Sequence, residues 1–434
     1  MKRQLMAASV VAALVVAVAA CGPGGNSKAG KQAADPKAVS GTLTIWLMND
    51  AQTNWPELVA QANNAFGAEY PNVTLKLSYQ TWADKVANLD DALTKGSAPD
   101  VVELGNTETM KYMLNNSLLP LDKSYFDNSE SWIRGLENTC TDGDKLLCVP
   151  YYAGARVAIY NSAMLQQATG SADFPATEDE LKAAVDKIQA KNKDNKTFSP
   201  LYLPGPYWYA AMSYVAAYGG TIARFDSTGN WHGALEDPKA QQGIQHFVDL
   251  VRAYNHNDLT VNELHQSDVI GKQKAAIVYG NGWEAASATT APNGDPALKD
   301  VLKVAGMPGP NGKPLPSFIG GSDLAVTAKS QVPALAKEWI KLFTSTKSEQ
   351  GLADKDILPN NLKQLSQLKF KPETAAAANA VPDAWFTPIA PGWAQVEKQN
   401  VLANMLNSIL AGKSVAEATK TADGQIDQLI NNPS

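Results

Sequence analysis

The sequence predicts an α/β protein with two domains, and two observations indicate this. Strand-like and helix-like patterns alternate along the chain, which is typical of a mostly parallel sheet covered by helices. About 390 residues follow residue 40, which is more than one hydrophobic core usually holds. We therefore expect two α/β units rather than one.

The alternation is regular in the first part of the chain. Leu43–Leu47, Val73–Leu77 and Val101–Leu104 have the composition or the two-residue period of strands, and apolar spacing predicts helices over 55–68 and 85–93 between them. Farther on we expect strands over 146–150, 157–160, 275–278 and 318–326, and helices over 210–218 and from residue 332 onward, with a long one over 394–411.

The first forty residues indicate export. A basic start and an apolar run, too short to span a bilayer comfortably, predict a signal peptide over residues 1–20. The run ends in Val18-Ala19-Ala20-Cys21, the pattern of a lipobox, so we expect Cys21 to be lipidated and residues 21–40 to form a flexible tether. An ordinary signal peptide followed by a chance cysteine is the alternative. Lipidation would hold the protein at the extracellular face of the cell membrane.

Charge and cysteine content limit the partners. The net charge is −6 and no basic patch is present, which argues against nucleic acid. Once Cys21 is set aside, Cys140 and Cys148 remain on either side of the turn-forming segment 141–144. Outside the cytoplasm such a pair oxidises, so we expect a structural disulfide. A redox-active pair is the alternative, but the Cys-x-x-Cys spacing is absent.

Polar side chains follow the ends of two predicted strands. Asn49 and Asp50 come directly after the first strand, and Asn106, Thr107 and Glu108 follow the strand at 101–104. Ligands of open α/β sheets bind beyond the carboxyl ends of the strands, so we expect these residues to share a crevice. The alternative is that some of them only cap helices or form turns.

Aromatic residues are numerous and many lie beside turn residues. The chain has 10 Trp and 14 Tyr; Tyr207 and Trp208 follow Pro-Gly-Pro, Trp283 follows Gly-Asn-Gly, and Trp393 follows Pro-Gly. Aromatic rings stack on the C–H faces of sugars while carboxylates and amides bind the hydroxyl groups. Core packing is the alternative interpretation for each ring.

Several segments in a fixed order resemble a known family. Gly143–Pro150 followed by Ile159-Tyr160-Asn161, Gly271–Ile277, and Gly320–Val326 followed by 336–343 and Gln350 are similar to segments of the family 1 extracellular solute-binding proteins of ABC sugar importers. The resemblance covers nearly the whole chain after the tether. Cys148 stands where the family usually has Gly, and Val269 stands where it usually has Phe. The local sequence at 46–48, 105–107, 150–153 and 385–393 is similar to an actinobacterial branch that takes chitobiose, cello- or malto-type oligosaccharides.

The resemblance implies a periplasmic-binding-protein-like fold of two lobes, with hinge crossovers and a central ligand cleft. It implies a first lobe of 41–152 plus 320–356 and a second of 153–319 plus 357–434, with hinge strands at 151–156 and 320–323 that line the cleft. It also implies an oligosaccharide ligand, the membrane subunits of an ABC transporter as partner, a monomer, and neither cofactor nor metal. The residues expected at the ligand are Asn49, Asp50, Trp82, Asn106, Thr107, Glu108, Tyr151, Arg156, Tyr207, Trp208, Trp283, Glu284, Gly321, Asp323, Trp385 and Trp393.

A secreted glycoside hydrolase is the main alternative function. It needs two carboxyl groups about 5–10 Å apart, and Asp50 with Glu108 or Glu284 would be the candidates. The strand ends carry Asn, Thr and Trp more often than paired acids, which favours binding. A Gly-x-Ser-x-Gly nucleophile elbow and a His-Glu-x-x-His metal motif are both absent from the sequence, and His232, His246, His256 and His265 lack ligand spacing. A surface adhesin without a closed cleft is a third possibility.

Overall fold

The computed structural model describes residues 36–82, 84–261, 266–290, 294–371 and 374–432. The expected signal peptide, Cys21, most of the tether and His265 lie outside these residues. Within the described part of the chain, no helix has the length and the apolar content that a membrane span requires.

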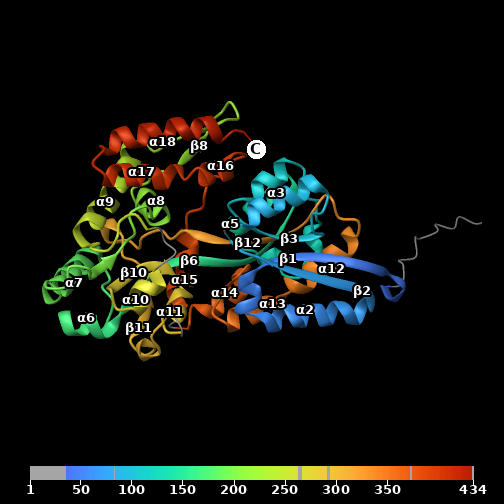
Figure 1. Cartoon of the computed structure of the whole chain (residues 1–434), viewed down its shortest axis with the longest axis horizontal. Helices are drawn as coiled ribbons and strands as arrows, with labels where there is room; N and C mark the ends of the chain where they lie inside the picture. Colours follow the sequence, from blue (N-terminus) through green and yellow to red (C-terminus); the bar gives the residue numbers. More distant parts are fainter. Residues whose placement is uncertain (1–35, 83, 262–265, 291–293, 372–373, 433–434) are drawn as a thin grey trace, which may run out of the picture.

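One connected β-sheet runs through both lobes in the order β2-β1-β3-β12-β6-β10-β7 (Figure 1). Its strands are β1 (Ser40–Met48), β2 (Asn72–Gln80), β3 (Val101–Gly105), β6 (Val149–Asn161), β7 (Ser199–Tyr202), β10 (Ala275–Asn281) and β12 (Ile319–Val326). β1 is parallel to β2 and β3, and β7 is parallel to β10, whereas β12 and β6 run antiparallel to their neighbours. Two short strands, β11 (Leu302–Ala305) and β13 (Leu358–Pro359), pair with β6.

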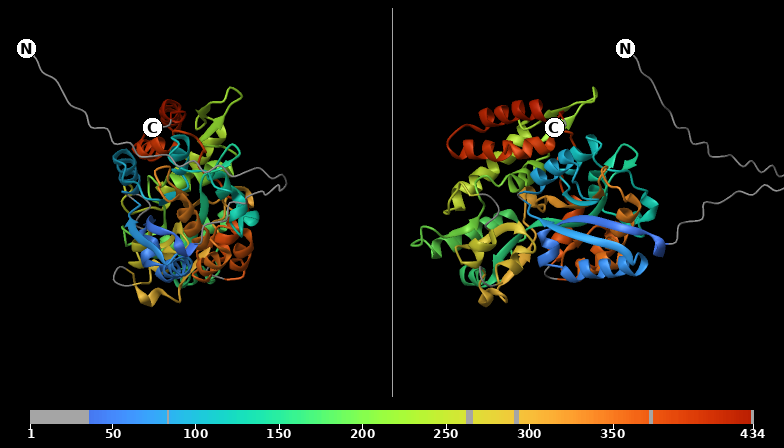
Figure 2. Two further views of the ribbon diagram at one scale, coloured as in Figure 1. Left: turned by 90° about the vertical axis from the view of Figure 1, so that its right-hand side faces the viewer. Right: turned by 45° about the vertical axis from the view of Figure 1, so that its right-hand side comes forward.

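Helices cover the sheet in each lobe. The first lobe carries α1 (Asn49–Thr53), α2 (Pro56–Glu69), α3 (Lys85–Lys95), α4 (Thr109–Leu114), α5 (Arg134–Thr139), α12 (Pro333–Phe343) and α13 (Thr346–Asp354). The second carries α6 (Ser162–Thr169), α7 (Glu178–Lys191), α8 (Trp208–Ala217), α9 (Pro238–Tyr254), α10 (Gln266–Gly271), α11 (Glu284–Ser287), α16 (Trp393–Lys398), α17 (Val401–Leu410) and α18 (Val415–Leu429), while α14 (Leu362–Leu368) and α15 (Ala375–Ala380) pack near the crossover. The hairpins β4–β5 (Thr141–Asp142, Lys145–Leu146) and β8–β9 (Ala223–Phe225, Trp231–Gly233) stand apart from the sheet, the latter against α18 (Figure 2).

Each lobe has its own hydrophobic core, and a third cluster joins them. Ile45, Phe66 and Trp339 belong to the first core, and Phe247 and Ile277 to the second. The third cluster collects side chains of α5, β6, β12, α14 and α15 around the crossover. The long chain therefore does bury more than one core, as its length predicts.

Strand β6, which runs from one lobe into the other, differs from the sequence expectation. We expected separate strands over 146–150 and 157–160, but β6 is one strand of 13 residues in which every residue is buried. Its first part pairs with β12 and its last part with β10 and β11. A strand covered on both faces does not need to alternate polar and apolar residues. The small residues 153–155 therefore show no strand pattern, and the sequence analysis did not recognise that one strand continues through them. The expected lobe boundaries near residues 152 and 319 fall at these shared strands and stay a prediction.

The expected long helix over 394–411 is also wrong. The chain forms α16 and α17, separated by Gln399 and by Asn400, whose φ is +53°. A left-handed residue cannot continue an α-helix, and asparagine tolerates this conformation better than most residues.

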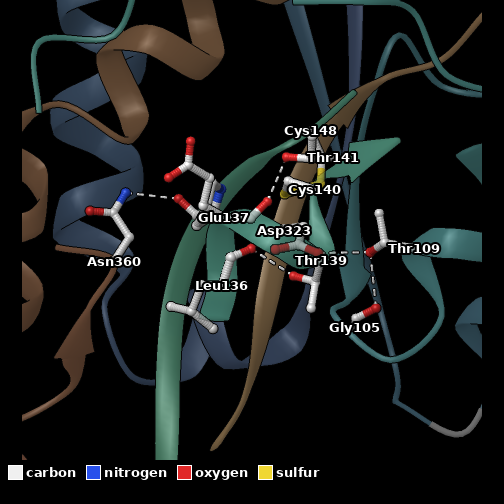
Figure 3. The surroundings of a disulfide bond; sticks show 11 residues. Gly105, Thr109, Leu136, Glu137, Thr139, Cys140, Thr141, Cys148, Asp323 and Asn360 are labelled. Carbon is white, nitrogen blue, oxygen red and sulfur yellow. Dashed lines mark hydrogen bonds between the residues drawn. A yellow bond between two sulfur atoms is a disulfide. The ribbon is translucent and has the colours of Figure 1, made fainter. Parts of the chain in front are cut away.

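The two remaining cysteines meet behind the first lobe's sheet. Cys140, after α5, and Cys148, before β6, lie with their Cα atoms 4.8 Å apart and their sulfur atoms joined (Figure 3). Both are fully buried, and the Asp323 side chain lies beside them. The separation is in the range that disulfides require.

Buried carboxyl groups should make the folded state depend on pH. Burial raises the pKa of Glu103 to about 7, of Asp323 to about 8 and of Asp423 to about 6, and raises the pKa of Glu349 well above its ordinary value. A carboxyl with a raised pKa in the folded state stabilises the fold at low pH, and that stabilisation is lost as pH rises through the folded-state pKa.

We therefore expect the free energy of unfolding to be larger at pH 5 than at pH 8.5, by an amount on the order of a few kcal/mol. Urea denaturation followed by circular dichroism at the two pH values measures this difference. A stability that stays constant or increases between pH 5 and pH 8.5 would show that these groups are ionised in the folded protein.

Candidate ligand-binding site

A cavity of about 780 Å³ lies where the two lobes meet. The first lobe contributes the start of α1 and the turn between β3 and α4. The second contributes β6, the start of α8, the β10–α11 turn and α16–α17, and the crossover strand β12 supplies Gly320 and Gly321. Its volume is in the range of small-molecule binding sites.

Asp50 occupies the first-lobe wall at the start of α1. Its Oδ2 accepts a hydrogen bond from Trp82 Nε1 at 2.6 Å, and the Trp82 side chain is 42% exposed. The backbone just before Asp50 is held by the buried side chain of Glu103. This carboxyl group accepts a hydrogen bond from Met48 N at 2.7 Å and another from Ser322 Oγ at 2.6 Å. Glu103 thus ties the strand end beneath Asp50 to the crossover strand.

The turn after β3 brings Asn106, Thr107 and Glu108 to the same wall, as expected. Glu108 forms an ion pair with Lys85 of α3, and Asn106 N donates to the Gly321 carbonyl at 3.0 Å. A Cβ on Gly105 would lie 3.1 Å from the Glu108 carboxylate and 3.4 Å from the Trp82 ring, so glycine permits this close arrangement.

Trp283 is an exposed aromatic side chain of the second-lobe wall. It follows β10, its side chain is 42% exposed, and its ring lies on the backbone of Gly154 in β6. A Cβ on Gly154 would lie 2.5 Å from Trp283 Cζ3, which leaves no room for any other residue there without moving the ring. Next to it, Glu284 Oε1 accepts from Asn281 N at 2.9 Å and from Asn281 Nδ2 at 3.1 Å.

Arg156 links this wall to an aromatic group at the start of α8. Its guanidinium donates to Asn281 Oδ1 and lies 4.8 Å from the centre of the Tyr209 ring and 5.4 Å from that of Phe318. Tyr209 stacks on Trp208, whose ring centre is 3.8 Å away. Tyr207 lines the cavity too, although its side chain is almost fully buried.

Tyr151 and Asp323 do not reach the cavity, contrary to expectation. The Tyr151 hydroxyl accepts from Trp55 Nε1 at 2.6 Å inside the first core, and Asp323 Oδ2 accepts from Thr109 Oγ1 at 2.8 Å beside the disulfide (Figure 3). Successive side chains of a strand point to opposite faces, so Tyr152 lines the cavity and its neighbour Tyr151 cannot.

Trp393, Trp385 and Asn49 are also absent from the cavity wall. Trp393 is 1% exposed and packs 6.0 Å from Trp208, so core packing is the correct interpretation for this ring. Trp385 packs on Phe318, donates to Ser213 Oγ at 3.0 Å and lines a separate hollow of about 330 Å³. The exposed Asn49 opens α1 one residue before Asp50.

The structure adds cavity residues that the sequence analysis did not name individually, although Tyr152, Gly154 and Gly320 lie in the segments expected to line the cleft. The clearest signal was available for Tyr152 and Gly154, because they alternate with Arg156 along one face of β6. Glu397 and Asn400, from α16 and the following break, had no such signal. The other additions are Asn54, Trp55, Lys85, Gly105, Pro206, Tyr209, Ser267, Asn281, Ser287, Phe318, Gly320, Ile357 and Ala403.

The cavity can therefore offer aromatic faces, carboxylate acceptors and amide groups from both lobes to one ligand. The one group of candidate metal ligands within the described residues is Cys140, Cys148 and Asp323, and both of its sulfur atoms are already joined to each other. Contact with a ligand stays a prediction for each residue of the wall.

Comparisons with known proteins identify the family of this chain. The family model of bacterial extracellular solute-binding proteins matches residues 61–383. The diacetylchitobiose binding protein DasA of Streptomyces coelicolor is 32% identical, over 99% of both chains.

Solved structures with a similar fold include the GacH receptor of Streptomyces glaucescens (TM-score 0.75, 22% identity, 90% of this chain and 99% of that one) and a solute-binding protein of Thermotoga lettingae bound with α-D-tagatose (TM-score 0.76, 20% identity, 90% and 100%). These similarities confirm the two-lobe fold class. The chain belongs to the bacterial extracellular solute-binding proteins.

Proposed function

We propose that this protein captures an oligosaccharide in the cavity between its lobes and delivers it to an ABC importer, acting as a lipid-anchored monomer outside the cell. The observation that supports this most is the pairing of half-exposed Trp82 and Trp283 with polar side chains of both lobes around one cavity. A relative named for diacetylchitobiose binding and a similar fold crystallised with acarbose support a sugar ligand.

The fixed positions of the wall residues suit this role. The Trp283 ring rests on Gly154, and the Asp50 carboxylate is oriented by Trp82 Nε1, so both are held before a ligand arrives. A site that is already ordered loses less conformational entropy on binding. A sugar that contacts both lobes also has a higher affinity for the closed arrangement and shifts the population toward it.

A glycoside hydrolase is less well supported. Glu108 is ion-paired with Lys85, and the Glu284 carboxylate accepts from both nitrogens of Asn281 that face it. The family model and the curated relative are both binding proteins. We propose that the bound sugar leaves the cleft unchanged.

A calorimetric screen tests the function directly. Diacetylchitobiose, cellobiose, maltose and maltotetraose should be titrated into the protein, and we expect saturable binding of at least one of them. Chromatography of the same sugars after hours of incubation should recover them intact. Absence of binding across the panel would contradict the proposal, and cleavage products would favour the hydrolase.

Replacing the Trp283 ring should weaken binding without unfolding the protein. By analogy with base stacking on aromatic side chains, Trp283→Ala should cost about 1–3 kcal/mol of binding energy, or roughly a 5- to 150-fold higher Kd. Its exposed position predicts a nearly unchanged Tm of the ligand-free protein. Titration and thermal unfolding measure the two quantities.

Phe225→Ala is a matched control for this variant, because Phe225 is 61% exposed on the β8–β9 hairpin and does not line the cavity. It should leave Kd unchanged. A large drop in the Tm of Trp283→Ala would instead identify Trp283 as a core residue.

The exported protein should carry two covalent modifications. We propose that Cys21 is lipidated and that Cys140 and Cys148 are oxidised, the latter because the buried pair already has disulfide geometry. Mass spectrometry of protein extracted from membranes without reductant should show a lipid-modified Cys21 at the N-terminus and one linked peptide. Cys21→Ser should release the protein into the medium. A variant that remains in the detergent phase, or free thiols at 140 and 148, would contradict the corresponding proposal.

A further inference from the structure

Asn281 is the last residue of β10 and lines the cavity on the second-lobe side. It lies directly opposite Arg156 in the antiparallel pairing of β10 with β6, and the turn that follows it carries Trp283 and Glu284. A Cβ on Gly154 would lie 2.5 Å from Trp283 Cζ3 and 3.6 Å from Asn281 Oδ1. The amide oxygen and the indole therefore lie over the same part of β6.

Both ends of the Asn281 side chain are engaged by protein groups. Its Oδ1 accepts a hydrogen bond from Arg156 Nη1, and its Nδ2 donates to Glu284 Oε1 at 3.1 Å. The backbone N of Asn281 donates to the same carboxylate oxygen at 2.9 Å. A guanidinium only donates and an ionised carboxylate only accepts, so these two partners determine which end of the amide is oxygen and which is nitrogen.

The Glu284 carboxyl group closes the turn that contains Trp283. A Cβ on Gly280 would lie 3.1 Å from each of its two oxygens, so the carboxyl group lies over the end of β10. From there Oε1 holds both nitrogens of Asn281, three residues earlier in the chain. The Trp283 side chain is thus restrained twice, by the Gly154 backbone under its ring and by the closed turn that carries its own backbone.

This bridge requires a neutral side chain that offers an acceptor and a donor at the same time. Of the side chains closest to asparagine in size, aspartate lacks the donor and leucine lacks both groups. An aspartate would also place a second negative charge where Nδ2 now lies 3.1 Å from Glu284 Oε1. Like charges at such a distance repel each other, so the bridge would open.

We propose that Asn281 is a positioning residue, whose amide bridges Arg156 and Glu284 and so fixes two parts of the second-lobe wall relative to each other. One part is the turn that carries Trp283, and the other is the guanidinium with the aromatic rings around it. This inference rests on the sugar-binding function proposed above. A stacking ring and a cationic donor that are already fixed lose less conformational entropy when a sugar binds. In this role Glu284 acts on the ligand through the Trp283 turn.

Exchanging the donor and the acceptor of the bridge tests this proposal. N281D removes the donor and brings two carboxylates together, so the Kd for sugar should rise roughly tenfold, as expected for a lost hydrogen bond to a charged group. Adding E284Q supplies a new donor, because the glutamine nitrogen can donate to the introduced carboxylate while its oxygen accepts from the backbone N of residue 281. We expect N281D/E284Q to bind within about threefold of the unmodified protein. A direct contact between Asn281 and the sugar would not be restored in this way.

Three further variants complete the comparison. E284Q alone keeps an oxygen for both Asn281 nitrogens, so it should weaken binding less than N281D does. N64D makes the same chemical change at an exposed residue of α2 outside the cavity wall and should leave the Kd unchanged. N281A removes the bridge without adding a charge, so it should also weaken binding, and E284Q should not restore it. N281A keeps the test decisive if N281D does not fold.

Calorimetric titration with diacetylchitobiose, or with maltotetraose if the first sugar gives no binding, measures each Kd, and thermal unfolding shows which variants are folded. A folded N281D or N281A with the affinity of the unmodified protein overturns the role of Asn281. A double variant N281D/E284Q that binds as weakly as N281D overturns it too. Failure of the unmodified protein to bind either sugar instead contradicts the sugar-binding function, and this inference with it.

Discussion

The close contact of β6 with β12 is the constraint on which the rest of the structure depends. These strands are paired where they cross between the lobes, and a Cβ on Gly321 would lie 2.4 Å from the Tyr152 carbonyl oxygen. The first lobe's sheet is bound to β12 through β3, and the second lobe's sheet is bound to β6 through β10. Because this pair of strands joins the parts of the sheet in the two lobes, it fixes the positions of the cavity walls. These walls include the aromatic residues at the start of α8 and the turn that carries Glu108.

Polar groups reinforce this arrangement from within. Glu103 connects the end of β1 to β12, and Asn106 connects the end of β3 to Gly321 in the same crossover strand. The Glu103 contacts are buried, where a hydrogen bond is electrostatically stronger than at the surface. The residues that present Asp50 and Glu108 to the cavity are therefore held by the crossover and by their own lobe.

The sequence predicted the regular part of this fold and the polar strand ends of the cavity wall, for identifiable reasons. Strand ends place polar residues at one edge of a sheet, so Asp50 and Glu108 were found from local pattern alone. Trp393 was wrongly placed because a preceding Pro-Gly turn says nothing of what the ring packs against. Tyr151 was wrong because the strand containing it was not recognised as continuous. Glu397 was missed because the segment 394–411 was predicted as one helix, whereas α16 ends at Lys398 and Asn400 has a positive φ.

The absence of a side chain at Gly154 sets the depth of the cleft. The indole of Trp283 rests directly on that backbone, so the floor of the cavity is as low as the polypeptide allows. A single methyl group at this position would displace the ring and reduce the space above it. Residue 154 thus limits how close the Trp283 ring can lie to β6, and its size controls the space above the ring without any change in the side chains of the wall.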